Sequence, residues 1–381
     1  MKSQITENQK FEESSKNAPN EDQKNTKGEK TNISLISSGE DNGDEILSIF
    51  EKYLAVWVVV CMGIGLLLSK YIPKIGETID SWQFQGISIP IGICLFLMMY
   101  PALMNVQISE IKKLKENPKP ILLTLLSNWI IAPLVAYGLG KAFLFNEEQL
   151  FVAVILLGSS PCTAMVLVWG KMANGNQEQN VINTSINTIT LIMFYGPIVV
   201  LLTGLESIQI DRMLLLISSL AFIGLPLVFG NLSKKIILKY KRKEWFENTY
   251  KPIVGKIATG ALLMTLIILF SLNGNVIINN FGLLLKVSIP LLLGFVIVVG
   301  YNLFITRKSG LEYPEGIIST IIGSSSHFEI AIATAVSIYG VGSIAALGTT
   351  MGLFWEVPIM LGLVYLGKYL GNRGFWKNRE D

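Results

Sequence analysis

The chain has 381 residues, of which 51% are hydrophobic and only 15% are charged, with a formal net charge of +3. A soluble protein would carry charge on about a quarter of its residues. The apolar residues gather instead in blocks of about twenty, the length that spans a bilayer core of about 30 Å. The composition therefore excludes a soluble domain. It predicts an all-α polytopic membrane protein surrounded by lipid, with no nucleic acid among its partners.

The two ends of the chain differ from the rest. Residues 1–45 are rich in Lys, Glu, Asn, Ser and Gln and have too few apolar residues to bury a core, so we expect a disordered tail. This polar start also argues against a cleavable signal peptide. Residues 46–372 should form one transmembrane domain, and residues 373–381 a second tail.

Ten apolar blocks follow the first tail in order, and short loops join them. Each is long enough for a transmembrane helix. They cover residues 52–70, 87–107, 119–141, 149–172, 180–204, 212–235, 252–272, 281–305, 315–340 and 344–369.

Lysines and arginines set the expected orientation. With the N-terminus inside, the inside loops hold most of the basic residues, including seven between Lys234 and Lys251. The outside loops hold only Lys70, Lys74, Lys141 and Arg212. This asymmetry predicts that both termini are cytoplasmic and that the protein lies in the cell membrane.

An internal repeat relates the two halves of the chain. LLGSSPCTAM at 156–165 and IIGSSSHFEI at 321–330 share an aliphatic pair followed by Gly-Ser-Ser, at an offset of 165 residues. The same offset carries the first blocks onto later ones, so residues of about 52–204 and about 212–369 form two repeats of five spans. Because five is odd, the repeats should be inverted, with broken helices four and nine crossing at the midplane, which is typical of transporters.

Small and polar residues in these two blocks predict the helix breaks. Gly158 and Pro161 weaken the first helix, and Gly323 begins the break in the second. Nearby hydroxyl groups could bond the freed backbone groups. The alternative is that the small residues only allow close helix packing.

Three side chains in these spans could carry the chemistry of a site. Cys162 follows Pro161, and a partly wet thiol there could bind a soft, thiophilic solute; Cys61 and Cys94 are expected to be packing residues. Glu329 and Glu356 lie near the middle of spans nine and ten, where a carboxyl group is costly and is a candidate for proton coupling. The alternative for each is a neutral acid that bonds a neighbouring helix.

Other polar residues could complete a solute site. His327 occupies the place that Cys162 holds in the first repeat, and could relay protons, contact the solute or simply bond a serine. Asn128, Ser160, Thr163 and Ser325 are further candidates for solute contacts. No basic residue lies at comparable depth, so the site suits a neutral solute or a cation. The sequence indicates no metal cluster, cofactor or disulfide and no oligomeric state, and no nucleophile–base pair of an enzyme.

Five motifs together resemble one family of transporters. PCTAMVLVW (161–169), NWIIAP (128–133), MMYPALMNV (98–106), FEIAIATA (328–335) and WEVPIMLGLVYL (355–366) are similar to segments of the arsenical-resistance arsenite permeases, within the bile acid/arsenite/riboflavin transporter superfamily. The resemblance covers about residues 50–370 in unbroken order.

The resemblance implies ten spans and export of arsenite or antimonite in exchange for protons. It implies that Cys162 binds the metalloid and that Glu329 couples to protons. Ser326 stands where the family usually has asparagine and His327 where it usually has phenylalanine, and Asn187-Thr188 stand where Asn-Asp is expected. Two other functions stay open: a sodium-coupled symporter of an organic anion, and a receptor or scaffold that acts through the long tail.

Overall fold

The computed structural model describes residues 53–376 apart from short gaps. The gaps are residues 73–77, 79, 80, 85, 86, 105–117, 164, 207, 209, 211, 212, 214–216, 218, 219, 280 and 341. The described residues from Ala55 onward belong to one compact unit. The predicted tail at residues 1–45 lies outside the described residues, so it stays a prediction.

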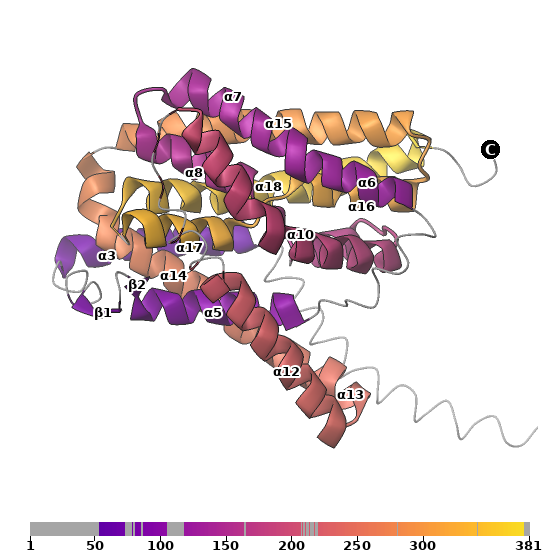
Figure 1. The fold of residues 1–381 in the computed structure, drawn as a ribbon, viewed down its shortest axis with the longest axis horizontal. Coiled ribbons are helices and arrows are strands. Elements are labelled where there is room, and N and C mark those ends of the chain that lie inside the picture. Colours follow the sequence, from indigo (N-terminus) through magenta and orange to yellow (C-terminus); the bar gives the residue numbers. More distant parts are fainter. Residues whose placement is uncertain are drawn as a thin grey trace, which may run out of the picture. The chain divides into compact units, whose positions relative to one another are not determined.

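Helices make up almost all of the described secondary structure (Figure 1). The first half contains α3 (Leu54–Tyr71), α5 (Ile89–Met104), α6 (Pro118–Leu126), the π-helix η2 (Ser127–Ile131), α7 (Ala132–Leu144), α8 (Glu148–Gly158), α9 (Met165–Met172) and α10 (Gln177–Gly204). The second half contains η3 (Leu220–Gly224), α12 (Leu225–Tyr240), α13 (Lys243–Trp245), η4 (Phe246–Tyr250), α14 (Lys251–Asn279), α15 (Phe281–Lys308), α16 (Tyr313–Ser324), α17 (Phe328–Tyr339) and α18 (Ile344–Asn372).

The all-α prediction has one small exception. β1 (Gln83–Phe84) and β2 (Ile87–Ser88) form an antiparallel pair in which Gln83 lies opposite Ser88. The pair lies in the connection between α3 and α5, where the hydrophobic blocks are interrupted.

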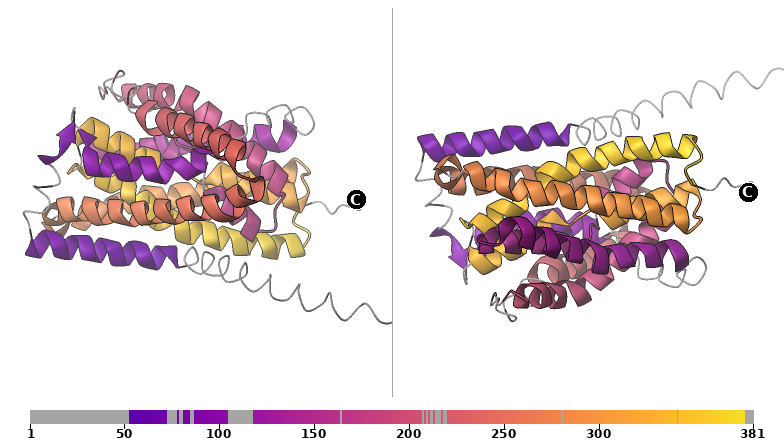
Figure 2. Two further views of the ribbon diagram at one scale, coloured as in Figure 1. Left: turned by 90° about the horizontal axis from the view of Figure 1, so that it is seen from below. Right: turned by 90° about the horizontal axis from the view of Figure 1, so that it is seen from above.

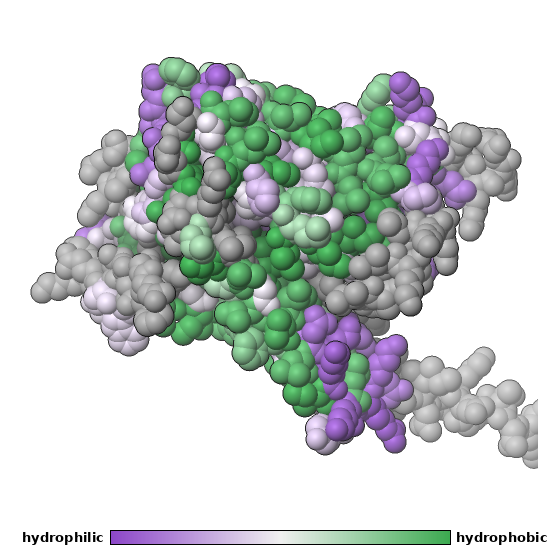
Figure 3. Space-filling model, in the orientation of Figure 1, coloured by the Kyte–Doolittle hydropathy of each residue, from purple (hydrophilic) through white to green (hydrophobic). Residues whose placement is uncertain are grey.

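Among the residues that the structure describes, six helical segments are long and apolar enough to cross a membrane: Pro118–Leu144, Gln177–Gly204, Leu220–Tyr240, Lys243–Leu272, Gly282–Lys308 and Ile344–Asn372. The same residues include four shorter apolar helices. Many apolar side chains are exposed on these helices, as with Leu134 on α7 and Val296 on α15. Figure 3 shows the resulting apolar surface, with hydrophilic residues gathered at the tip formed by α12 and α13. Such a surface fits hydrocarbon rather than water.

One helix continues beyond the apolar block that predicts it. Basic residues follow the block at 212–235, but α12 continues to Tyr240 and the chain is helical again from Lys243 to Asn279. Lysine has a high helix propensity, so the basic residues extend the helix instead of ending it. α12 ends where Lys241 takes an extended conformation.

The helices pack in two groups. Small residues allow neighbouring helices within a group to approach closely. α7, α8, α15, α16, α17 and α18 contact one another, while α5 packs on α12 and α14. In the left view of Figure 2 the long helices α14 and α18, which contact each other, run in nearly the same direction. Gly158 lies against Ala136, where a Cβ atom on Gly158 would come within 2.3 Å of the Ala136 Cβ atom. Close backbone approach through small residues is the usual basis of helix packing in lipid.

Candidate functional site

Two interrupted helices meet at their breaks. α8 ends at Gly158 and α9 begins at Met165, while α16 ends at Ser324 and α17 begins at Phe328. The extended segments between them form an antiparallel bridge in which Pro161 lies opposite Ser326. The two polar breaks therefore lie against each other in the structure.

The bridge explains why a proline is tolerated here. The Cys162 amide donates to the Ser325 carbonyl over 3.3 Å, and the His327 amide donates to the Ser160 carbonyl over 2.6 Å. Both bonds join the neighbours of Pro161 and Ser326, so these two residues form a non-hydrogen-bonded pair. Neither needs its own N–H group for the bridge. Proline, which has none, fits that position.

The glycines at the breaks act through packing. Gly158 is the last residue of α8 and Gly323 the last but one of α16, so the helices end just beyond them. A Cβ atom on Gly323 would lie 2.7 Å from Asn302 Oδ1 and 3.1 Å from Ser127 Cβ. Gly158 and Gly323 therefore allow close helix packing and also lie where their helices end.

The thiol of Cys162 lies in an apolar environment. The residue is 2% exposed and belongs to a cluster with Val166 and Trp169 of α9, Ile318 and Ile322 of α16, and Met360 of α18. The expectation of a partly wet thiol is wrong for this conformation. The reason is that α16 and α18 cover the beginning of α9, which the sequence did not reveal. Cys61 is also buried, and Cys94 is half-buried.

His327 and Glu329 form a buried pair at the start of α17. The Nδ1 atom of His327 lies 2.7 Å from Glu329 Oε2. His327 is 1% exposed and Glu329 is 8% exposed. Glu329 lies in the first turn of α17, where the positive end of the helix dipole stabilises a negative charge. The Nε2 atom of His327 has no hydrogen-bond partner among the described residues.

Glu356 of α18 contacts the second break directly. It is fully buried, and its Oε1 atom accepts from the Ser326 amide over 3.0 Å. Its Oε2 atom accepts from Ser326 Oγ over 2.5 Å. The two acidic residues singled out by the sequence therefore flank the same short segment, Ser326-His327.

A network of amides surrounds the crossing. Asn128 Nδ2 donates to Asn187 Oδ1 over 3.2 Å, and Asn187 Nδ2 reaches the Cys162 carbonyl over 3.5 Å. Ser160 Oγ donates to the carbonyl oxygens of Leu157 and His327. The Thr163 hydroxyl is buried and has no hydrogen-bond partner within the part of the chain that the structure describes.

Sequence reasoning missed a second amide hub. Asn302 of α15 is 1% exposed, and its Nδ2 atom reaches the Ser127 hydroxyl, the Gly323 carbonyl and the Ser324 hydroxyl over 2.8–3.0 Å. Ser127 in turn donates to the Gly323 carbonyl over 2.7 Å. The sequence feature that indicates this hub is an asparagine inside the apolar block at 281–305.

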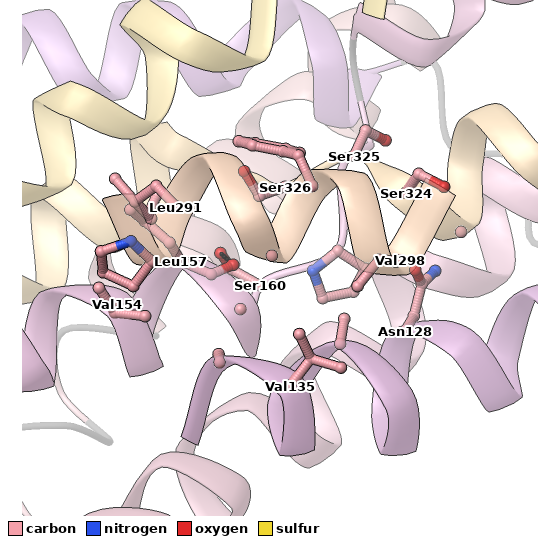
Figure 4. A pocket seen from close by; sticks show the side chains of 18 residues that line it. Asn128, Val135, Val154, Leu157, Ser160, Leu291, Val298, Ser324, Ser325 and Ser326 are labelled. Atoms are coloured by element: carbon pink, nitrogen blue, oxygen red, sulfur yellow. Dashed lines mark hydrogen bonds between the residues drawn. The ribbon is translucent and has the colours of Figure 1, made fainter. Parts of the chain in front are cut away.

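A pocket lies between α7, α15 and the two breaks (Figure 4). Figure 4 shows Val135 on α7 and the serines of the breaks around it. Of the predicted site residues, Asn128, Gly158, Ser160, Pro161, Gly323 and Ser325 line this pocket. Cys162, Thr163, His327, Glu329 and Glu356 are not among its lining residues. The structure thus brings all of the predicted residues to the crossing, but only six of them to one cavity.

Membrane-length helices with two paired breaks define a multi-pass membrane transporter. Known proteins agree: the Sodium Bile acid symporter family matches residues 92–280. The uncharacterized transporter slr0944 of Synechocystis is 37% identical over 88% of this chain and 91% of its own length.

Two further relatives define the family more closely. The arsenical-resistance protein Acr3 of Alkaliphilus metalliredigens is 33% identical over 84% of this chain and 92% of its own length. Acr3 of Corynebacterium glutamicum is 30% identical over 86% of this chain and 91% of its own length. The chain belongs to the arsenical-resistance (Acr3) family within the bile acid symporter group, and so to the transporters rather than the enzymes.

Proposed function

We propose that the protein exports arsenite or antimonite from the cytoplasm in exchange for protons. Two relatives are arsenical-resistance proteins, and the match to this chain covers over nine-tenths of the length of each. The observation that carries the proposal is the position of Cys162 at the crossing of the two breaks. A thiol is the ligand that a soft, thiophilic metalloid prefers. Arsenite is a neutral solute at neutral pH, which fits a site without deep basic residues.

In this proposal the crossing lies at the middle of a ten-span domain. The count is supported by six long helical segments, by α3 and α5, and by the two pairs of interrupted helices, α8 with α9 and α16 with α17. The repeats would be inverted and both termini would lie in the cytoplasm of a cell membrane, as the basic residues predict. One repeat rocking against the other would expose the crossing to each side in turn.

Burial of Cys162 means that the proposed arsenite site is closed in this conformation. The thiol is covered by α16 and α18, so in this conformation it is closed to water. Separation of α9 from Met360 would open it. A single thiol binds weakly, which suits a carrier that must release its cargo. Asn128, Ser160, Thr163, Ser325 and His327 would supply the surrounding polar contacts.

Glu329 is the proposed proton-coupling group. Its carboxyl group lies 2.7 Å from the His327 ring, so a change in its protonation acts on the residue that bonds the Ser160 carbonyl at the crossing. Protonation of Glu329 from outside would favour release of arsenite from Cys162. Glu356 is the second acid at the crossing, and its carboxyl group accepts hydrogen bonds from Ser326.

The second function is a sodium-coupled symporter of an organic anion. The observation in its favour is the match of residues 92–280 to the Sodium Bile acid symporter family. The N-terminal ends of α9 and α17 could attract an anion through their dipoles. Cys162 would then have no role in transport.

Uptake by everted membrane vesicles separates the two functions. Arsenite should accumulate when the vesicle interior is acidic, because protons that leave the vesicle exchange for arsenite that enters, and sodium should have no effect. Arsenite accumulation that requires sodium would contradict arsenite–proton exchange. A lack of arsenite accumulation in vesicles that contain the folded protein would contradict it as well. Vesicles without the protein are the control.

A further inference from the structure

The two breaks satisfy their backbone groups differently. In the bridge, Pro161 and Ser326 face each other, and the hydrogen bonds come from their neighbours. An N–H group at either of these positions therefore points away from the bridge. At Pro161 no such group exists. At Ser326 it exists, and leaving the N–H group of this half-buried residue without a partner would be unfavourable.

The carboxyl group of Glu356 bonds that N–H. Its Oε1 atom accepts from the Ser326 amide and its Oε2 atom accepts from the Ser326 hydroxyl, over 3.0 and 2.5 Å. The side chain is completely buried. The described residues give it no basic partner, since its hydrogen bonds go only to Ser326 and its acidic neighbour at the crossing is Glu329.

We propose that Glu356 is a positioning residue that closes the break between α16 and α17 by bonding the Ser326 backbone, where the other break uses a proline. This contact holds Ser326 opposite Pro161 and so holds His327 and Cys162 in register. Glu356 thus acts on the site through Ser326. Its test by arsenite uptake rests on the proposed transport function, whereas its test by thermal unfolding does not.

The bonding pattern does not depend on the charge of Glu356. An ionised carboxylate accepts from both groups of Ser326. A protonated carboxyl accepts from the amide with one oxygen and shares a hydrogen bond with the hydroxyl through the other. A glutamine at this position does the same, because its amide oxygen accepts from the N–H group and its NH2 group donates to the serine oxygen. A methionine of similar length can do neither.

Four variants test this assignment through thermal unfolding in detergent and arsenite uptake by vesicles. Glu356→Gln should unfold at the native temperature and keep at least half of the native uptake rate and the native pH profile. Glu356→Met should unfold at a lower temperature and lose at least tenfold in rate. Adding Ser326→Pro to Glu356→Met removes the orphaned N–H group and should restore most of the loss in both readouts. Glu329→Gln, which removes the other buried acid, should abolish proton dependence and serves as the control.

Each outcome decides the matter. If Glu356→Gln unfolds like the native protein but loses proton-driven uptake, Glu356 carries protons and the positioning role is wrong. If Glu356→Met unfolds at the native temperature, or if Ser326→Pro does not restore it, the account of the Ser326 N–H group is wrong. If the native chain takes up no arsenite, the proposed function fails, while the unfolding temperatures still decide the role of Glu356.

Discussion

Contact between Gly158 and Ala136 determines how closely α8 can approach α7. A Cβ atom on Gly158 would lie 2.3 Å from the Ala136 Cβ atom and 3.3 Å from the Ala132 carbonyl oxygen. Carbon atoms in good contact are about 3.5–4.0 Å apart, so Gly158→Ala requires a movement of more than about 1 Å. Overpacking of this kind costs about 1–3 kcal/mol. We therefore expect a lower unfolding temperature for Gly158→Ala, and weaker transport because the first break follows this residue directly.

The reciprocal change identifies the steric partner. Gly158→Ala combined with Ala136→Gly moves one methyl group from α7 to α8 and leaves the interface filled. Exchanging glycine and alanine within helices changes the helix propensity terms by about 1 kcal/mol each, in opposite directions. The double variant should therefore unfold near the native temperature.

Thermal unfolding of the purified protein in detergent is the assay for this series. Gly138→Ala on α7 is the matched control, because nothing lies within 4 Å of its added Cβ atom, and it should leave the unfolding temperature unchanged or slightly raised. Native-like unfolding of Gly158→Ala would refute the packing argument. A double variant no better than Gly158→Ala would show that Ala136 is not the partner.

Two other predictions concern hydrogen-bonded pairs that contain an acidic side chain. The Lys141 ammonium donates to Glu206 over 2.7 Å and keeps the pKa of that carboxyl below its usual value, so this pair contributes stability above the unfolded pKa, and the contribution is lost as the pH falls through the folded pKa. Glu206→Gln should therefore lower the unfolding temperature slightly at pH 7 and not in strong acid; an equal effect at both pH values would contradict the pairing. His327→Phe removes the hydrogen-bond partner of Glu329 and should change the pH at which arsenite uptake is half-maximal while leaving arsenite binding intact. An unchanged profile would mean that His327 has only a structural role.

The crossing could be predicted from the sequence because its signals are local and repeated. Gly-Ser-Ser recurs at an offset of 165 residues, and Pro161 marks one break clearly. The pairing of Pro161 with Ser326 follows from that repeat. The apolar surroundings of Cys162 could not be predicted, because they come from α16 and α18, more than 150 residues away in the chain.

Long-range hydrogen bonds account for the other differences. The sequence shows two buried acids but not their partners, and only the fold brings Glu329 to His327 and Glu356 to Ser326. Asn302 escaped notice because one amide within an apolar block does not indicate a hub. The end of α12 lies beyond the apolar block at 212–235 because the lysines that follow this block support a helix.

The most direct test of the central claim compares cysteine variants in one assay. Arsenite uptake should be measured in everted vesicles with and without a proton gradient, for the native chain, Cys162→Ala and Cys61→Ala. Cys61 is also a buried cysteine, but it lies on α3 away from the crossing, so its replacement controls for the loss of a thiol from the membrane domain. We predict gradient-driven uptake by the native chain and by Cys61→Ala, and loss of uptake by Cys162→Ala with its unfolding temperature near that of the native protein. Uptake by Cys162→Ala at the native rate would contradict the role of this thiol as the arsenite ligand.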